Sequence, residues 1–179
     1  MDWFWVFLLY SFGGYLLEKS FAFATAAPQQ VRKCQLLLPL CPVYGLGMLA
    51  VLALPRAWTD TAWKLGVVGA LTVTAVEFAV HWLYERLLGV RFWDYSPVRG
   101  EVAGRVCLPF TAIWGVLIVG AVTFLHPWVV ALAVRMPPWL TYALLLTLTV
   151  DVFFSALVLR RGGDVSLMSV KNLLRMLEG

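Results

Sequence analysis

The sequence predicts an all-α integral membrane protein, a bundle of about five transmembrane helices followed by a C-terminal amphipathic cytoplasmic helix. Its 179 residues are 61% hydrophobic and only 13% charged, whereas soluble domains average about 45–50% apolar residues and about 25% charged residues. The mean hydropathy is +0.83. Five apolar segments approach the roughly 20 residues that a bilayer-spanning helix requires. This composition excludes an ordinary soluble enzyme and a disordered chain.

Each predicted span has its own justification in the sequence. The first opens without the basic residues of a signal peptide, so it is interpreted as a membrane helix. The second carries Pro39, Pro42, Gly45 and Gly47 near its start, which indicates either irregular backbone or a proline-capped helix start. Segment 126–136 is too short to span and is expected to be a loop or a short interfacial helix. The five spans are 3–26, 36–54, 64–87, 107–125 and 138–159.

Two regions of the chain are distinguished by composition. Residues 1–163 form one polytopic transmembrane domain, and residues 164–179 form a tail that follows a Gly-Gly pair. Leu167, Leu174 and other apolar side chains of the tail fall on one helical face. The tail is therefore expected to lie on the membrane surface or to dock a cytoplasmic partner.

The basic residues predict the orientation in a plasma (inner) membrane. Five spans would leave ten Lys and Arg on one side and three on the other, and the richer side is cytoplasmic. The N-terminus is then external and the C-terminus cytoplasmic. The net charge of +4 is interpreted as this topology signal and not as a nucleic-acid surface. The ten are Arg32, Lys33, Arg86, Arg91, Arg99, Arg105, Arg160, Arg161, Lys171 and Arg175; the three are Arg56, Lys64 and Arg135.

Five ionisable side chains inside the spans form the predicted site. Glu77, His81 and Glu85 recur every four residues and share one helix face. Asp151 and Glu18 lie at similar depths, in the cytoplasmic half of their spans. We expect the five to converge on an acidic chamber open to the cytoplasm, suited to proton exchange, a divalent cation or a cationic substrate. Alternatively, each polar group only bonds a neighbouring helix.

Metal and nucleotide chemistry have weak support. Glu77 and His81 have the spacing of two ligands on one helix, but no HExxH and no second nearby histidine accompany them. We therefore predict no metal and no cofactor. The chain lacks GxSxG and GxxxxGK[ST], so an ATPase would have to be another subunit. If the chain is an enzyme, which is the less expected case, its acid or base is a buried carboxylate or His81.

Four sequence blocks resemble a known family of small membrane proteins. The blocks are SFGGYLLE (11–18), LCPVYGLG (40–47), WDYS (93–96) and GRVCLPFTAIWG (104–115). They look like the family named putative ABC-transporter type IV. The stretch 100–103 departs from the Asn-rich turn that this family would lead one to expect.

The resemblance implies a membrane subunit of an ABC-type transporter that works with a separate ATPase subunit. It also implies that a set of motif residues belongs to the family's pattern together with Glu18 and Glu77, and by the predicted topology most of them lie at a cytoplasm-facing site. The motif residues are Cys41, Pro42, Tyr44, Trp93, Asp94, Tyr95, Arg105 and Cys107.

Three functions remain open from the sequence. The first is a transport-related permease subunit in the lipid bilayer. The second is a stand-alone intramembrane enzyme or a lipid- or small-molecule-binding protein, and the third is a structural or assembly factor. Because five spans are few to enclose a transport path, an oligomer or heteromer is expected. Gly66, Ala70 and Thr74 form a small-residue face that suits packing within the chain or in a homo-oligomer.

Overall fold

The computed structural model describes residues 2–25 and 35–168. The chain is mostly helical, at 75%. Within the described residues, three helices are long and apolar enough to cross a membrane: α3 (Ala62–Leu88), the continuous run Leu108–Ala133, and α6 (Pro138–Gly162). These helices agree with the all-α membrane class predicted from composition.

The two N-terminal helices differ from the long apolar ones. α1 (Asp2–Ala24) has 23 residues and a length of about 34 Å, but it includes Glu18, Lys19 and several Tyr, Trp and Gly. α2 (Pro42–Leu52) has 11 residues, or about 16 Å, which is too short to cross a bilayer alone. The predicted span 36–54 is therefore only partly helical, and its helix begins at Pro42.

The helix at the fourth predicted span, 107–125, is longer than predicted. α4 (Leu108–Gly120), a π-helical turn (Ala121–Leu125) and α5 (His126–Ala133) follow one another without a break. The expected loop or separate interfacial helix at 126–136 is wrong, because the helix runs on to Ala133. The N–H of His126 bonds the carbonyl of Ala121, and this widened turn accommodates Pro127, which has no N–H to donate.

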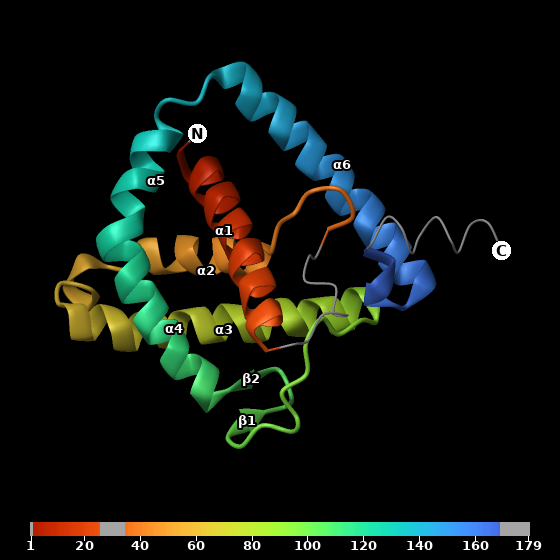
Figure 1. Ribbon diagram of the computed structural model, residues 1–179, viewed down its shortest axis with the longest axis horizontal. Coiled ribbons are helices and arrows are strands. Elements are labelled where there is room, and N and C mark those ends of the chain that lie inside the picture. The colour runs from red at the N-terminus through yellow and green to blue at the C-terminus, as the bar shows by residue number, and fades with distance from the viewer. Residues whose placement is uncertain (1, 26–34, 169–179) are drawn as a thin grey trace.

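α1 packs mainly against α2, and α3 packs mainly against α4, while α6 lies at one edge of the bundle. Figure 1 shows α2 and α3 side by side, crossed by α1 and by the α4–α5 helix. α6 lies on the far side of α1 from α4–α5 in this view. At the top of the view the indole N–H of Trp5 on α1 donates to the hydroxyl of Thr141 on α6 over 2.9 Å.

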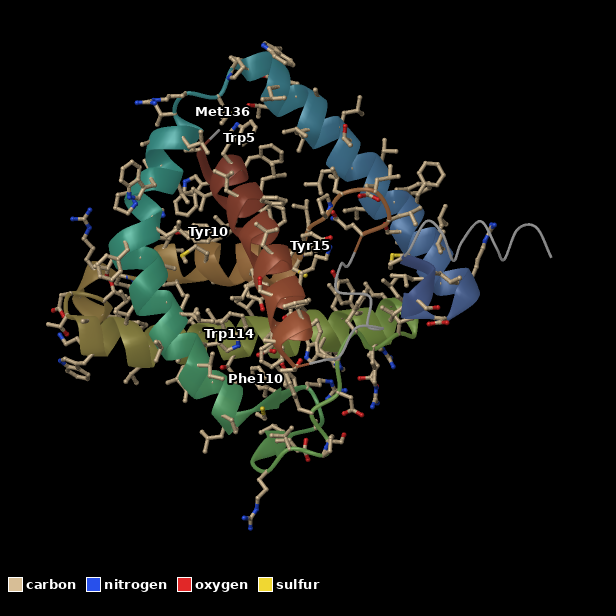
Figure 2. The ribbon with its side chains drawn as sticks, viewed as in Figure 1. Trp5, Tyr10, Tyr15, Phe110, Trp114 and Met136 are labelled. Atoms are coloured by element: carbon tan, nitrogen blue, oxygen red, sulfur yellow. The ribbon has the colours of Figure 1, made fainter. Side chains whose placement is uncertain are left out.

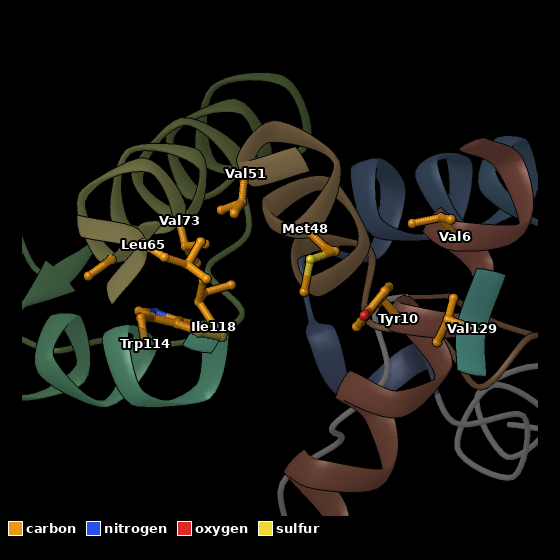
Figure 3. Close-up of a cluster of buried hydrophobic side chains, with 10 residues drawn as sticks. Val6, Tyr10, Met48, Val51, Leu65, Val73, Trp114, Ile118 and Val129 are labelled. Carbon is orange, nitrogen blue, oxygen red and sulfur yellow. The ribbon is translucent and has the colours of Figure 1, made fainter. Parts of the chain in front are cut away.

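The hydrophobic core lies where α1, α2, α3 and α4 meet. Met48, Val73 and Ile118 are buried there (Figure 3). Glycines allow the close approach: a Cβ on Gly115 would lie 3.1 Å from the carbonyl of Gly66, and one on Gly69 would lie 2.7 Å from Ile118. The small-residue face of α3 is thus used for packing inside the chain, against α4.

The outer surface carries many large apolar side chains. Val116, Phe124 and Trp128 on the α4–α5 helix are each about three-quarters exposed, at 75%, 74% and 76%. Water would disfavour such a continuous apolar surface, whereas hydrocarbon would solvate it. The exposed surface therefore supports a membrane environment for these helices.

A non-helical segment, residues 35–41, enters the helix assembly and connects to α2. Its backbone N–H groups are paired by side chains of α6: Leu37 and Leu38 donate to the carboxylate of Asp151 over 2.9 and 2.7 Å, and Leu36 donates to Ser155 over 2.9 Å. Asp151 lies near the middle of α6. Irregular backbone at this depth is tolerated only when its polar groups are satisfied by protein.

A short hairpin and two 3-10 turns complete the described chain, and the first of these turns, η1 (Arg56–Trp58), lies between α2 and α3. β1 (Glu101–Val102) and β2 (Val106–Cys107) pair antiparallel in the loop between α3 and α4. η3 (Val165–Met168) follows α6 and buries Met168 against Val90 and Leu159. Most of the predicted C-terminal amphipathic helix, residues 169–179, lies outside the described residues.

Candidate functional site

A cavity of about 940 Å³ lies between α1, α2, α3, α4 and the loop that precedes the hairpin. Figure 2 shows Trp114 and Phe110 projecting from α4 toward the C-terminal end of α1. Polar and aromatic side chains from five separate parts of the chain line it. Among them are Glu18, Tyr44, Glu77, Tyr95 and Trp114.

Glu77 is the most enclosed carboxylate of the cavity, with 4% of its surface exposed. The hydroxyl of Tyr95 donates to one carboxylate oxygen over 3.0 Å, and the indole N–H of Trp114 donates to the other over 2.9 Å. The ion pairs among the described residues join Lys64 to Asp60 and two arginines to Glu85, and none includes Glu77. Neutral donors therefore hold this carboxylate in place.

Glu18 reaches the same cavity from α1. The hydroxyl of Tyr44 donates to its carboxylate over 2.7 Å, and the Tyr44 ring stands edge-on to the Trp114 ring at a centroid distance of 5.0 Å. A Cβ on Gly14 would overlap the Tyr44 ring. The second glycine of SFGGYLLE thus makes room for the tyrosine of LCPVYGLG, which explains why these two blocks belong together.

The WDYS block holds its loop by hydrogen bonds. The Asp94 carboxylate accepts from the N–H and the hydroxyl of Ser96 over 2.9 and 2.6 Å, and these bonds hold the pKa of Asp94 below its usual value. The Tyr95 N–H donates to the carbonyl of Gly104 over 2.8 Å. The Trp93 indole donates to the carbonyl of Arg105 over 2.9 Å. The loop therefore fixes the direction of the Tyr95 side chain.

Tyr95 remains a hydrogen-bond donor over the physiological pH range. Burial raises the pKa of its hydroxyl well above the usual value, and the nearby Glu77 carboxylate raises it further. Its ring stacks on Phe110 at a centroid distance of 5.1 Å. Gly104 has a φ of +67°, and a Cβ there would lie 2.9 Å from the Asp94 carboxylate, so this position favours glycine.

His81 and Glu85 hold the loop and do not line the cavity. Glu85 pairs with Arg91, and with Arg105 over 2.7 Å. The Nε2 of His81 lies 3.0 Å from the carbonyl of Trp93, to which it donates. Arg105 also lies over the Phe78 ring at 5.2 Å from its centroid. These contacts attach the C-terminal turns of α3 to the WDYS and GRVC blocks.

The structure brings together two of the five predicted chamber residues. Glu18 and Glu77 line the cavity, whereas His81 and Glu85 contact the loop and Asp151 binds the backbone of residues 35–41. Counting residues along a helix predicts the depth of a side chain but not the neighbour that its helix face meets. Asp151 lies near the middle of α6, and its carboxylate is turned toward Leu37 and Leu38.

The remaining motif residues shape the two helix starts. Cys41 and Cys107 are buried and directly precede α2 and α4. Pro42 is the first residue of α2, a position where its missing N–H costs nothing. Cys41 lines the cavity, and its N–H donates to the carbonyl of Ser11 over 2.9 Å.

Sequence reasoning missed Trp114 as a site residue. It lies inside the GRVCLPFTAIWG block (104–115), whose pattern does not distinguish it from the other apolar positions of the span. Its position in the middle of a span was the available signal, because a buried indole N–H needs an acceptor. Within the described part of the chain, no group of three or more His, Cys, Asp or Glu could hold a metal ion.

Comparison with known proteins gives one match. A sequence model of the family described as putative ABC-transporter type IV matches residues 5–158. This range includes every cavity residue named above. The searches of curated proteins and of solved structures returned no match.

Proposed function

Because this chain belongs to the putative ABC-transporter type IV family, we propose that it is the permease subunit of a transporter and that its cavity receives an organic cation. The observation that carries the proposal is the Glu77 carboxylate, buried beside a 940 Å³ cavity and bonded only by neutral donors among the described residues. A positive substrate group would supply the charge partner that a buried carboxylate favours.

The aromatic rings around the cavity support an ammonium group as the recognised feature. Tyr44, Tyr95, Phe110 and Trp114 line it together with Glu77. Aromatic faces attract ammonium groups, most strongly where water is excluded. A carboxylate surrounded by aromatic rings is therefore suited to a primary or quaternary amine.

The proposed topology has five crossings, with the cavity on the cytoplasmic side. Residues 35–41 and α2 together make the second crossing, because α2 alone is too short. The loop between α3 and α4 carries Arg91, Arg99 and Arg105, which supports a cytoplasmic position for this end of the bundle. The N-terminus is then external to the plasma membrane.

Binding of tetramethylammonium tests the cavity directly. Purified protein in nanodiscs should bind this cation in calorimetry, and Glu77→Gln should weaken binding about tenfold or more. Glutamine retains one acceptor for Trp114 and a donor for the Tyr95 oxygen, so the fold should persist. Asp60→Asn removes the same charge from an exposed ion pair and should leave the affinity unchanged.

The alternatives give different results in that experiment. Equal affinity in wild type and Glu77→Gln, or no binding to either, would refute the cation site. If Glu77→Gln instead only lowered thermal stability, the assembly-factor function would be favoured.

The transporter assignment has its own test. Native mass spectrometry of protein gently extracted from its host should show a stoichiometric nucleotide-binding subunit, with one or more copies of this chain. A lone oligomer without an ATPase would contradict the assignment and favour a stand-alone lipid- or small-molecule-binding protein.

A further inference from the structure

A second cavity, of about 730 Å³, lies mainly between α1 and the α4–α5 helix and is also lined by Met48 of α2 and Val73 of α3. Its lining contains no charged side chain. Leu17, Tyr44, Trp114 and Leu117 line both cavities. The two cavities therefore meet at these residues, one polar and acidic, the other apolar.

The apolar cavity is a groove with unfilled space beside two glycines of its walls. Gly13 on α1 and Gly120 on α4 line it, and a Cβ added at either would meet no other atom within 4 Å. The π-helical turn Ala121–Leu125 also borders the groove. Such turns interrupt regular helices and are frequent at functional sites.

The groove faces the surface that hydrocarbon would cover. Val116, Leu125 and Trp128 line it and are half to three-quarters exposed. A molecule in the bilayer can therefore reach the groove from the side, without crossing water. Where the two cavities meet, that molecule contacts Tyr44 and Trp114, which donate hydrogen bonds to Glu18 and Glu77 of the acidic cavity.

We propose that the substrate is a cationic amphiphile, with its ammonium group beside Glu77 and its hydrocarbon chain in the groove between α1 and α4–α5. This inference rests on the proposed function and adds the substrate class. The buried carboxylate selects the positive head, and the uncharged groove accepts the chain. An anionic amphiphile of the same length would place like charges together and should be rejected.

A photoreactive probe tests this arrangement. Dodecyltrimethylammonium carrying a diazirine at the end of its chain is added to the full-length protein in nanodiscs, and the adducts are mapped by mass spectrometry. Adducts should fall on residues 9–17 and 116–132, where both walls of the groove lie. Unlabelled dodecyltrimethylammonium should compete, whereas dodecyl sulfate should not.

Two variants separate head from chain recognition. Glu77→Gln should reduce the groove adducts about tenfold, because the head loses its charge partner. Gly120→Leu should reduce them to a similar extent by filling the groove. At this helical position, leucine also has the better helix propensity. Ala143→Leu, on the exposed surface of α6 and outside both cavities, should change nothing.

The outcomes distinguish this inference from the function on which it rests. Groove adducts that persist in Glu77→Gln and are displaced equally by dodecyl sulfate would mean that any hydrocarbon fills the groove, and would overturn the inference. Adducts elsewhere would overturn it as well. In both cases, Glu77-dependent binding of tetramethylammonium would leave the organic-cation site standing, and loss of that binding would refute both.

Discussion

Replacing Asp151 with asparagine should destabilise the fold while leaving the affinity for tetramethylammonium unchanged. Asp151 is fully buried, and its two carboxylate oxygens accept from Leu37 and Leu38 over 2.9 and 2.7 Å. Asparagine keeps one oxygen and replaces the other with an amino group. One backbone N–H of the segment 35–41 would then face another donor.

The expected magnitude follows from that lost acceptor. A buried N–H without a partner costs about 1–3 kcal/mol. For a chain of this size each kcal/mol shifts Tm by roughly 2–4 °C, so a loss of about 2 kcal/mol should lower Tm by about 4–8 °C. Asp151→Ala leaves both N–H groups unpaired and should lose about twice as much.

Thermal unfolding in nanodiscs, followed by tryptophan fluorescence, measures the effect. The control is Thr149→Val on the same helix, where an exposed hydroxyl donates only to the carbonyl of Leu145. That change should alter the free energy of unfolding by less than about 0.5 kcal/mol. Calorimetry on the same samples measures the affinity for the cation.

The opposite pattern would refute the structural role of Asp151. If Asp151→Asn melted at the wild-type temperature but no longer bound the cation, the carboxylate would act in the chamber, as residue depth alone suggested. A normal Tm together with normal binding would show that the bonds to residues 37 and 38 contribute little.

Three further predictions concern the motif blocks. Gly14→Ala should lower the free energy of unfolding, measured by thermal unfolding, by about 1–3 kcal/mol, because its Cβ would overlap the tyrosine ring of α2. Gly13→Ala, with open space around it, should leave that free energy unchanged or raise it by up to about 1 kcal/mol. Equal effects of the two substitutions would contradict the packing of Gly14 against the ring. Arg105→Lys should lose about 1–2 kcal/mol, measured in the same way, because lysine cannot reproduce the guanidinium contacts with the glutamate and phenylalanine of α3. Since the pKa of Asp94 is lowered, its bonds to Ser96 should stabilise the loop above about pH 3.9, the ordinary aspartate pKa, and this stabilisation should be lost as the pH falls through the lowered value. Hydrogen exchange at the Ser96 amide should accelerate only in that acidic range. Asp94→Asn should remove this pH dependence.

Secondary structure was predictable wherever length and composition alone decide it. The spans expected at 64–87 and 138–159 correspond to α3 (Ala62–Leu88) and α6 (Pro138–Gly162). A run of more than 20 apolar residues has to satisfy its own backbone in hydrocarbon, and a helix does so locally. No distant contact is needed, so the sequence pattern is sufficient.

The second span was predicted only in part: its prolines indicate an irregular or proline-capped start, but how far the backbone stays non-helical depends on distant side chains. Residues 35–41 stay non-helical inside the fold because Asp151 and Ser155, more than 110 positions later, accept their N–H groups. A local pattern cannot contain that information. The continuation of the fourth span over 126–133 was not predicted, because the segment alone is too short to span; the structure shows that a π turn joins it to α4.

The sequence by itself determined that the molecule is a helical membrane protein of the family identified above, and it predicted which ionisable groups and motif residues form the site. Only the tertiary structure decided which of them meet. Glu18 and Glu77 share a cavity, and Asp151 does not, because helix packing sets the direction of each helix face. Trp114 and Tyr95 converge on Glu77 from α4 and from a loop, and such convergence depends on the packing of separate elements, which periodicity along one helix does not encode.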